Sequence, residues 1–207
     1  MTAPSHPLNH PILEQSFAVI DREIGPHSLT SAEYAIVRRI IHSTADFEFK
    51  DRVVFSAGAI EAGIEAIRQG TPIVVDVSMV RQGITSLIHR TFQNPIITAV
   101  DRAETALPGK TRTETGLLQC LAEFPTAIYV IGNAPTALLA LCAHCATHCT
   151  PPALVIGVPV GFIAVLESKA ALAQLSVPQI RVDGRKGGSP VASAIVNALI
   201  LLAWERS

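Results

Sequence analysis

The segment after Thr30 has the clearest helical pattern in the chain. Its apolar side chains recur at intervals of three and four, at Tyr34, Val37, Ile40 and Ile41. That spacing places them on one face of a helix. Thr30 and Glu33 have the sequence of a capping box, in which each side chain accepts a hydrogen bond from the other residue's backbone N–H. We therefore predict a helix from Ser31 to Thr44.

Beyond this helix, short apolar segments alternate with helical ones. The predicted strands are Arg52–Phe55, Ile73–Val77, Ile96–Val100, Ala127–Ile131, Ala153–Ile156 and Gln179–Val182. The predicted helices are Ala57–Gln69, Thr113–Ala122, Pro135–Thr147, Leu166–Leu175 and Pro190–Trp204. Continuous apolar strands separated by helices indicate a mainly parallel sheet that is covered on both faces. We expect an α/β fold, a three-layer sandwich in one domain spanning residues 1–207, with residues 1–11 as an irregular, proline-rich arm.

Composition narrows the possible partners. The chain has 207 residues, a length suited to one large core, with 49% apolar and 16% charged residues. So little charge indicates a thick core and an oligomer interface. The net charge of −1 favours neither nucleic acid nor an anionic membrane as a partner. The apolar segment from Val191 to Trp204 is too short to span a bilayer, and we interpret it as a buried or interfacial helix. No secretory signal is evident at the N-terminus, so we expect a cytoplasmic protein.

The four cysteines are unevenly spaced, and three of them lie close together. A secreted disulfide framework would use wider spacing in a smaller domain, so we expect a reducing compartment. The cluster Cys142, His144, Cys145, His148 and Cys149 contains five possible metal ligands. A zinc site normally draws its ligands from two separated pairs, whereas cysteines at helical spacing also serve as small core residues. Both interpretations stay open, although no metal site is assigned.

In folds of this class the ligand lies beyond the carboxyl ends of the strands. The segments at that position are 56–58, 76–78, 101–102, 132–133, 157–158 and 183–185. One candidate constellation lies on the first predicted helix, where Arg38 and Arg39 stand four and three residues before His42 and can share its face. An arginine can hold a substrate carboxylate. The positive charge of a neighbouring arginine favours the neutral form of His42, and the histidine can still donate a proton near pH 7. The same pattern also fits a solvated basic face.

Three further segments could bind anions. Gly132 to Thr136 forms a strand-to-helix turn with Pro135 at the first helical position, so the helix end could bind an anion. Thr111, Arg112 and Thr113 offer an arginine flanked by hydroxyl groups. Gly184 to Ser189 combines glycines with Arg185 and Lys186. An ordinary turn, a helix cap with a surface arginine and a flexible basic loop are the respective alternatives. Neither Gly-x-Gly-x-x-Gly nor a P-loop occurs, which argues against a nucleotide-dependent enzyme.

Six segments together resemble the precorrin-8X methylmutase family, also called cobalt-precorrin-8 methylmutase. They are Gln15–Ile20, the Arg39-x-x-His42 helix, Asp76–Val80, Ile131–Leu138, Gly157–Phe162 with Glu167–Lys169, and Arg185–Ser189. They follow the order of the family across nearly the whole chain. The sequences Gly-Asn-Ala-Pro-Thr-Ala and Gly-x-Pro-Val-Gly-Phe are the specific ones.

The resemblance implies an α/β homodimer that moves a methyl group from C-11 to C-12 of a corrin precursor in cobalamin biosynthesis. Active sites near the subunit interface and no separate cofactor are implied, with any cobalt arriving inside the substrate. By position, His42 resembles the family's proton donor or acceptor, and Ser16 and Arg39 resemble its substrate-binding pair. Arg112 resembles a further clamp on the substrate, and we add Thr111 and Asn133 as substrate-binding candidates.

Two other functions fit parts of the sequence. A non-catalytic tetrapyrrole carrier would keep the arginines and need no acid at position 42. A metal-handling protein would be built around residues 142–149. Turnover of the corrin precursor would exclude the first, and metal analysis would test the second.

Overall fold

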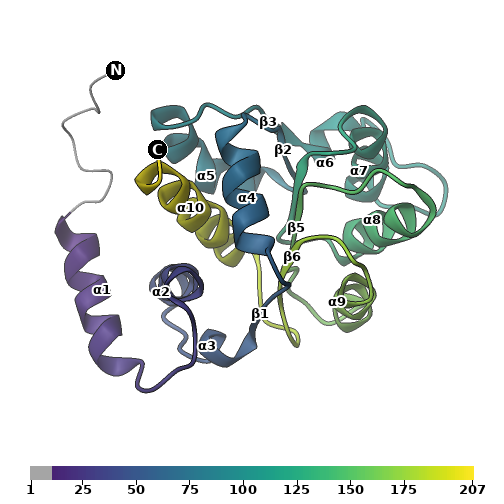
Figure 1. Ribbon diagram of the computed structural model, residues 1–207. Helices are drawn as coiled ribbons and strands as arrows, with labels where there is room; N and C mark the ends of the chain where they lie inside the picture. Colours follow the sequence, from purple (N-terminus) through teal and green to yellow (C-terminus); the bar gives the residue numbers. More distant parts are fainter. Residues whose placement is uncertain (1–10) are drawn as a thin grey trace.

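The computed structural model describes residues 11–207, which form a six-stranded sheet between two layers of helices (Figure 1). The strands are β1 (Val53–Phe55), β2 (Ile73–Val75), β3 (Ile96–Thr98), β4 (Ile128–Ile131), β5 (Leu154–Gly157) and β6 (Gln179–Val182). The longer helices are α1 (Pro11–Glu23), α2 (Ser31–Thr44), α4 (Ala59–Arg68), α5 (Ser78–Arg90), α7 (Arg112–Glu123), α8 (Pro135–Thr147), α9 (Val165–Ala173) and α10 (Ser189–Glu205). The two remaining helices, α3 (Phe49–Arg52) and α6 (Ala99–Arg102), are short. The predicted α/β sandwich is confirmed.

The sheet has the order β1-β6-β5-β4-β2-β3, and every neighbouring pair except β1–β6 is parallel. β1 is antiparallel to β6, with Phe55 opposite Ile180. The loop after β1 therefore lies at the opposite end of the strands from the loops that follow the other five. In this loop the Ser56 hydroxyl accepts a hydrogen bond from the backbone N–H of Gln179. Our placement of residues 56–58 at the ligand edge was wrong, because a three-residue apolar strand contains no signal for its direction.

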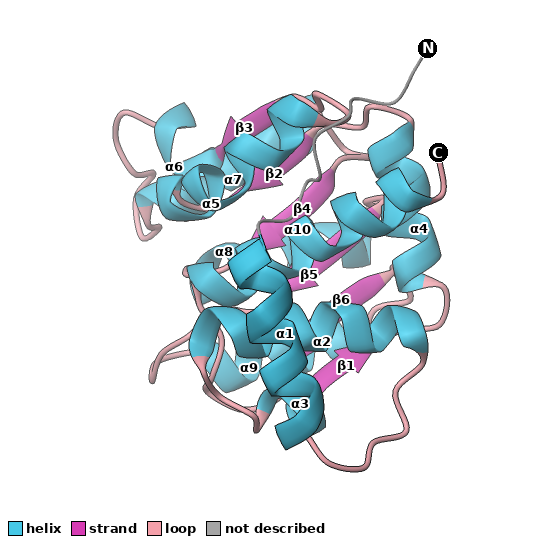
Figure 2. Ribbon diagram, turned by 90° about the vertical axis from the view of Figure 1, so that its left-hand side faces the viewer, coloured by secondary structure: helices cyan, strands magenta, loops and turns pink. Residues whose placement is uncertain are grey.

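Alternate strand residues face two separate cores. Ile73, Val75 and Val130 join the larger core under α1, α2, α4, α5 and α10, whereas Val74 and Tyr129 join the core under α7, α8 and α9. Figure 1 shows the helices of these two cores on opposite sides of the sheet, and Figure 2 looks onto the sheet from the side of α1, α2 and α10. This alternation is the period-two pattern of a sheet buried on both faces.

α10 is the central helix of the larger core, and it packs against α2, α4 and α5. Its residues Ile195, Leu199 and Ile200 are almost completely buried. The interpretation of this apolar segment as a buried helix is confirmed. In the described part of the chain, no helix is long and apolar enough to cross a membrane.

The helix predicted from Ser31 to Thr44 has these same bounds in α2, and its capping box is present. The backbone N–H of Thr30 donates to Glu33 at 2.8 Å, and the backbone N–H of Glu33 donates to the Thr30 hydroxyl at 3.3 Å. Four helices were not predicted, the longer α1 and α5 and the short α3 and α6. The expected irregular arm lies outside the described residues except for Pro11, which begins α1. The strand predicted to Val100 ends at Thr98, because Ala99 already begins α6.

Candidate functional site

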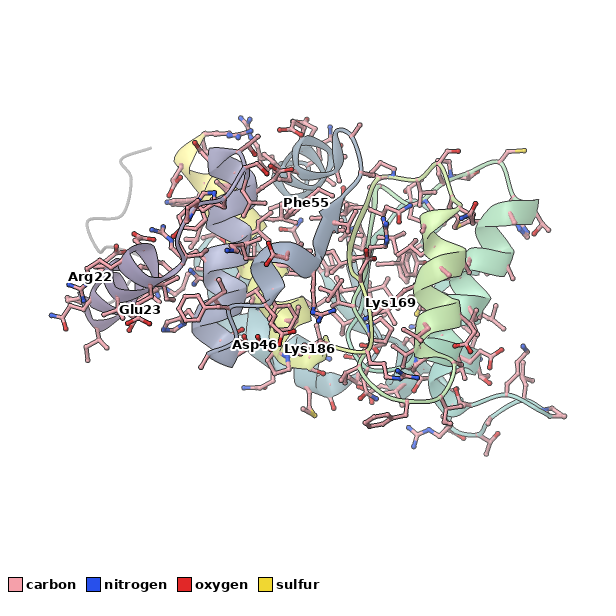
Figure 3. All side chains as sticks on the ribbon, turned by 90° about the horizontal axis from the view of Figure 1, so that it is seen from below. Arg22, Glu23, Asp46, Phe55, Lys169 and Lys186 are labelled. Atoms are coloured by element: carbon pink, nitrogen blue, oxygen red, sulfur yellow. The ribbon has the colours of Figure 1, made fainter. Side chains whose placement is uncertain are left out.

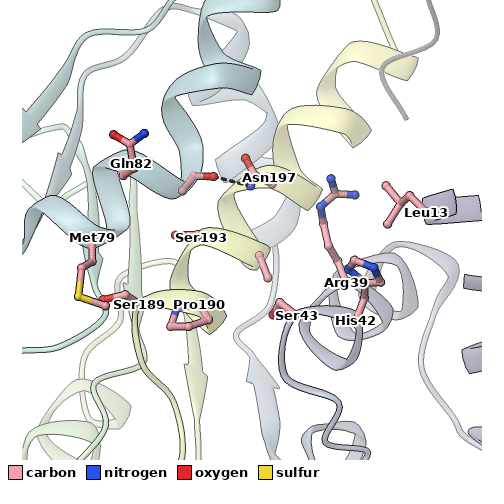
Figure 4. Close-up of a pocket in the computed structure, with 12 residues that line it drawn as sticks. Leu13, Arg39, His42, Ser43, Met79, Gln82, Ser189, Pro190, Ser193 and Asn197 are labelled. Carbon is pink, nitrogen blue, oxygen red and sulfur yellow. Dashed lines mark hydrogen bonds between the residues drawn. The ribbon is translucent and has the colours of Figure 1, made fainter. Parts of the chain in front are cut away.

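The main candidate site is a cavity of about 700 Å³ between the C-terminal part of α2 and the N-terminal parts of α5 and α10 (Figure 4). α1 adds Leu13 to its rim. The lining residues are Leu13, Arg39, His42, Ser43, Met79, Gln82, Gly83, Ser189, Pro190, Ser193, Ala194 and Asn197. A concave, mostly apolar space with a few polar groups is the usual form of a small-molecule site.

Arg39 and His42 lie beside one another on the α2 wall of this pocket. Their spacing of three residues gives them the same helix face, as the sequence predicts. Partial burial lowers the pKa of His42 below its ordinary value, and the positive charge of Arg39 lowers it further. Phe17 contacts the His42 ring edge-on, with the ring centroids 5.6 Å apart. The site therefore combines a fixed cation with an imidazole that gives up a proton readily.

Arg38 does not share this site. Its guanidinium pairs with Asp21 on α1 at 3.1 Å and lies over the Phe17 ring at 4.3 Å. Tyr34 also donates a hydrogen bond to Asp21. The predicted trio of Arg38, Arg39 and His42 thus divides, with Arg38 holding α1 against α2 while the other two face the pocket.

The opposite wall presents polar groups that the sequence analysis did not select. Asn197 on α10 donates to the backbone carbonyl of Gly83 on α5 at 2.9 Å (Figure 4), while its side-chain oxygen has no partner among the described residues. Ser193 and Asn197 are four residues apart and lie in the longest apolar segment of the chain. Polar residues at i and i+4 in an apolar helix indicate a shared polar face, which is the signal that could have identified them.

Gly83 allows these two walls to approach closely. A side-chain carbon added at this position would lie 2.7 Å from the Cβ atom of Ser193. A glycine inside a helix normally weakens it. Here the missing side chain lets the backbone of α5 at Gly83 pack directly against the Ser193 side chain of α10.

The predicted anion site at the start of α8 is already occupied by a carboxylate of the protein itself. Asp76, fully buried after β2, accepts hydrogen bonds from the backbone N–H groups of Val77, Gly132, Asn133 and Ala134 at 2.6–3.1 Å. Burial raises the pKa of Asp76, while the four donors act in the opposite direction. These N–H groups, at the point where the strand order reverses between β2 and β4, are therefore engaged within the protein.

The comparison with known proteins identifies the family. A family model described as precorrin-8X methylmutase matches residues 11–202. The chain belongs to the precorrin-8X methylmutase family. A protein of Synechocystis sp. named cobalt-precorrin-8 methylmutase is 61% identical, with 96% of this chain and 98% of that protein covered. A protein of the same name from Priestia megaterium is 42% identical over 91% of this chain and 86% of its own.

A solved structure agrees with both the fold and the family. The crystal structure of the precorrin-8X methylmutase from Thermus thermophilus superimposes with a TM-score of 0.87 at 41% identity, covering 95% of this chain and 99% of that one. The protein is accordingly an enzyme, an isomerase of cobalamin biosynthesis that moves a methyl group within a molecule. The resemblance drawn from the sequence is confirmed.

The remaining predicted substrate residues of the methylmutase do not line the pocket formed within one chain. The Ser16 hydroxyl donates to the carbonyl of Ile12 within α1. Arg112 donates to the backbone carbonyls of Val100 and Ala103, so it holds the end of α6. Among residues 11–207, the pocket lining does not include Ser16, Thr111, Arg112 or Asn133.

Thr111 is a helix cap, which was the alternative interpretation of its segment. Its hydroxyl accepts from the backbone N–H of Glu114 and so caps α7, and it lies 3.0 Å from the Thr136 hydroxyl on α8. Asn133 is exposed. As substrate contacts, all four residues stay predictions.

The cysteine-rich segment of the methylmutase lies at the end of α8, in the helix layer opposite the pocket. Burial raises the pKa of the Cys142 thiol to about 12, and Cys142 packs in the smaller core, as expected for a small core residue. His144 and His148 stack with ring centroids 3.7 Å apart, and Cys149 is exposed. Within the described residues, no group of three or more His, Cys, Asp or Glu side chains is placed to hold a metal ion.

Proposed function

We propose that this protein moves a methyl group from C-11 to C-12 of cobalt-precorrin-8 or precorrin-8X, giving cobyrinate or hydrogenobyrinate. The observation that supports this reaction is the shared position of Arg39 and His42 on the wall of one largely apolar pocket. The relatives that are named for this reaction are similar over nearly the whole chain.

Substrate binding follows from the chemistry of the corrin precursor, an apolar ring that carries acetate and propionate side chains. Arg39 can bind one carboxylate through charged hydrogen bonds. Leu13, Met79 and Pro190 offer apolar contacts to the ring. These contacts hold the ring at a fixed height above His42.

The methyl migration itself needs no external acceptor. The bond from the methyl carbon to C-11 breaks while the bond to C-12 forms, so the macrocycle gains and loses no atom. His42 supplies a proton to the ring that carries the migrating methyl and receives one back after the shift, which selects the reacting tautomer. Because its pKa is lowered, the protonated form of His42 is a stronger acid than free imidazole. No separate cofactor enters this scheme.

The cobalt-containing substrate is the one we favour. The relatives from Synechocystis sp., Priestia megaterium and Leptospira interrogans are all named cobalt-precorrin-8 methylmutase. In this scheme the cobalt belongs to the substrate.

We further propose a cytoplasmic homodimer whose second copy covers the open side of the pocket. Large apolar side chains on one chain are unusually exposed: Phe162 by 86%, Ile163 by 84% and Met79 by 68%. Exposed apolar surface of this kind marks an interaction site. A second chain also supplies a second set of Ser16, Thr111, Arg112 and Asn133, which are our remaining candidates for carboxylate contacts.

The deciding experiment incubates the purified protein with cobalt-precorrin-8 and, separately, with precorrin-8X, and follows the visible spectrum. We expect conversion to the corrin chromophore, faster with the cobalt form. His42→Ala should fold and bind product but lose turnover by about 100-fold or more, the usual contribution of a general acid. His89→Ala, on α5 outside the pocket lining, is the matched control. Turnover of the His42→Ala protein at the native rate would exclude the assigned role.

A further inference from the structure

Lys169 is a buried lysine that the proposed reaction does not use. It lies on α9, in the helix layer opposite the pocket, and the residue is only 3% exposed. Its ammonium donates to the backbone carbonyls of Gly184 at 2.8 Å and Lys186 at 2.7 Å. Burial lowers its pKa to about 8, with the charge of Asp183 acting in the opposite direction. A buried ammonium is retained at neutral pH only where such acceptors compensate for the loss of water.

The loop that Lys169 holds connects β6 to α10. Two more backbone contacts fix it to the segment after β5, because Gly188 donates to Val158 at 2.8 Å and Gly161 donates to Arg185 at 3.4 Å. Gly187 has φ of +152°, and a side chain there would collide with the carbonyl of Val158. The loop, residues 184–188, is therefore a defined structure rather than the flexible basic loop that was its alternative interpretation.

The same loop also contacts the pocket's other wall. Lys186 extends from it to Asp46, which follows the end of α2, at 2.6 Å, and to Glu48 at 3.1 Å. Figure 3 shows Lys186 beside Asp46 and Lys169 approaching from α9. Asp46 lies four residues after His42, and the loop leads directly into Ser189 and Pro190 of the pocket. The loop thus joins the wall that carries His42 to the wall formed by α10.

From these contacts we infer that Lys169 is a positioning residue of the methylmutase: it fixes the loop that sets the start of α10 relative to His42. Lys169 does not touch the pocket and acts only through the backbone carbonyls of the loop. The ion pair between Lys186 and Asp46 then connects the loop to the end of α2. The inference rests on the proposed function only for its effect on the rate, since the effect on the loop is independent of any reaction.

The first test replaces Lys169 with methionine, which keeps the length and removes the charge. Amide hydrogen exchange of residues 184–193 should become at least tenfold faster, because two carbonyls lose their donor. kcat/KM should fall tenfold or more. Lys110→Met, which breaks the ion pair between Lys110 and Glu114 at the start of α7, is the control and should leave both measurements within twofold of the native protein. Unchanged exchange or unchanged kcat/KM in a folded Lys169→Met protein overturns the inference.

A double-mutant cycle separates positioning from general loss of stability. If Lys169 and Lys186 act through one loop, the Lys169→Met/Lys186→Met protein should have kcat/KM within twofold of the more impaired single variant. If the fold-losses in kcat/KM of the two single variants multiply in the double variant, Lys169 and Lys186 do not act through the same loop. The Lys186→Met and Asp46→Asn substitutions lie in a partly exposed ion pair, so they test the path even where Lys169→Met fails to fold. Native kcat/KM in both would overturn it.

Failure of the proposed function has a different signature. A native protein that converts neither precorrin-8X nor its cobalt form disproves the reaction, and hydrogen exchange in the Lys169→Met protein then decides alone whether Lys169 holds the loop.

Discussion

At the scale of single residues, the charges near the pocket have divided roles. Arg39 and His42 face the cavity, whereas Arg38, Lys186 and Asp76 are engaged with other groups of the protein. Sequence spacing identified the helix that carries the site but could not separate Arg38 from Arg39. Both residues precede His42 by one turn, and only the position of Asp21 on α1 determines which arginine turns away.

The interaction between Arg39 and His42 predicts a shift in pH dependence. Burial and the Arg39 charge both hold the pKa of His42 below its ordinary value of 6.5. A step that needs protonated His42 is therefore available at low pH and is lost as pH rises through this lowered pKa. Arg39→Gln should move the titration upward, because it removes one of the two causes. NMR titration of the His42 ring measures the shift, with Arg38→Gln as the control. An unchanged or lower His42 pKa in Arg39→Gln would contradict the assignment.

The buried carboxylate of Asp76 predicts a large effect on stability. Asparagine at this position keeps one acceptor oxygen and turns an N–H₂ group toward backbone donors, so at least one backbone N–H of the β4–α8 loop loses its partner. We expect Asp76→Asn to lower the free energy of unfolding by about 2–4 kcal/mol. Urea unfolding measures this change, and Asp101→Asn at an exposed position of α6 should change it by less than about 0.5 kcal/mol. Equal stability of the two variants would show that the Asp76 hydrogen bonds contribute little.

At the scale of elements, the site depends on how closely α5 and α10 pack. Glycine to alanine in a helix normally stabilises it by roughly 0.5–1 kcal/mol. Gly83→Ala should instead destabilise the protein and reduce kcat/KM, because the added carbon overlaps Ser193. The Gly83→Ala/Ser193→Gly protein should recover much of the lost stability. Thermal unfolding and the spectral assay test both outcomes, and a more stable Gly83→Ala protein would show that the two helices separate without cost.

The elements that the sequence predicted and those it missed differ in their local signals. α2 has a side-chain cap and a regular apolar stripe, so its bounds could be predicted. α5 begins after Val77 without a side-chain cap and contains Gly83 within its second turn, so its sequence gives no clear signal for the start of a helix. Its site residues, Met79 and Gln82, were missed together with it. The polar residues of α10 that line the pocket were missed as well. Which polar residues of a buried helix reach a cavity depends on how the helix packs against elements that are distant in sequence.

At the scale of the whole molecule, the exposed loop after β5 predicts association. Phe162 and Ile163 lie on this loop, close in sequence to Gly161 and Val160. Replacing Phe162 with serine should weaken the proposed dimer at least tenfold, since a buried aromatic side chain dominates such contacts. Sedimentation equilibrium measures the dissociation constant, with Leu107→Ser, another exposed apolar position, as the control. A native protein that remains monomeric at all concentrations would contradict the dimer itself.

The carboxylate of Asp76 also has a consequence for the evolution of this scaffold. Many α/β proteins bind phosphate groups with the backbone N–H groups that Asp76 engages here. As long as this carboxylate is present, these donors are closed to a phosphate group, and the proposed substrate pocket lies elsewhere, between α2, α5 and α10. Aspartate and glycine codons differ by one base, so a single mutation would free these donors. The same mutation would remove the hydrogen bonds that Asp76 makes to this loop, so freeing the donors would also cost stability.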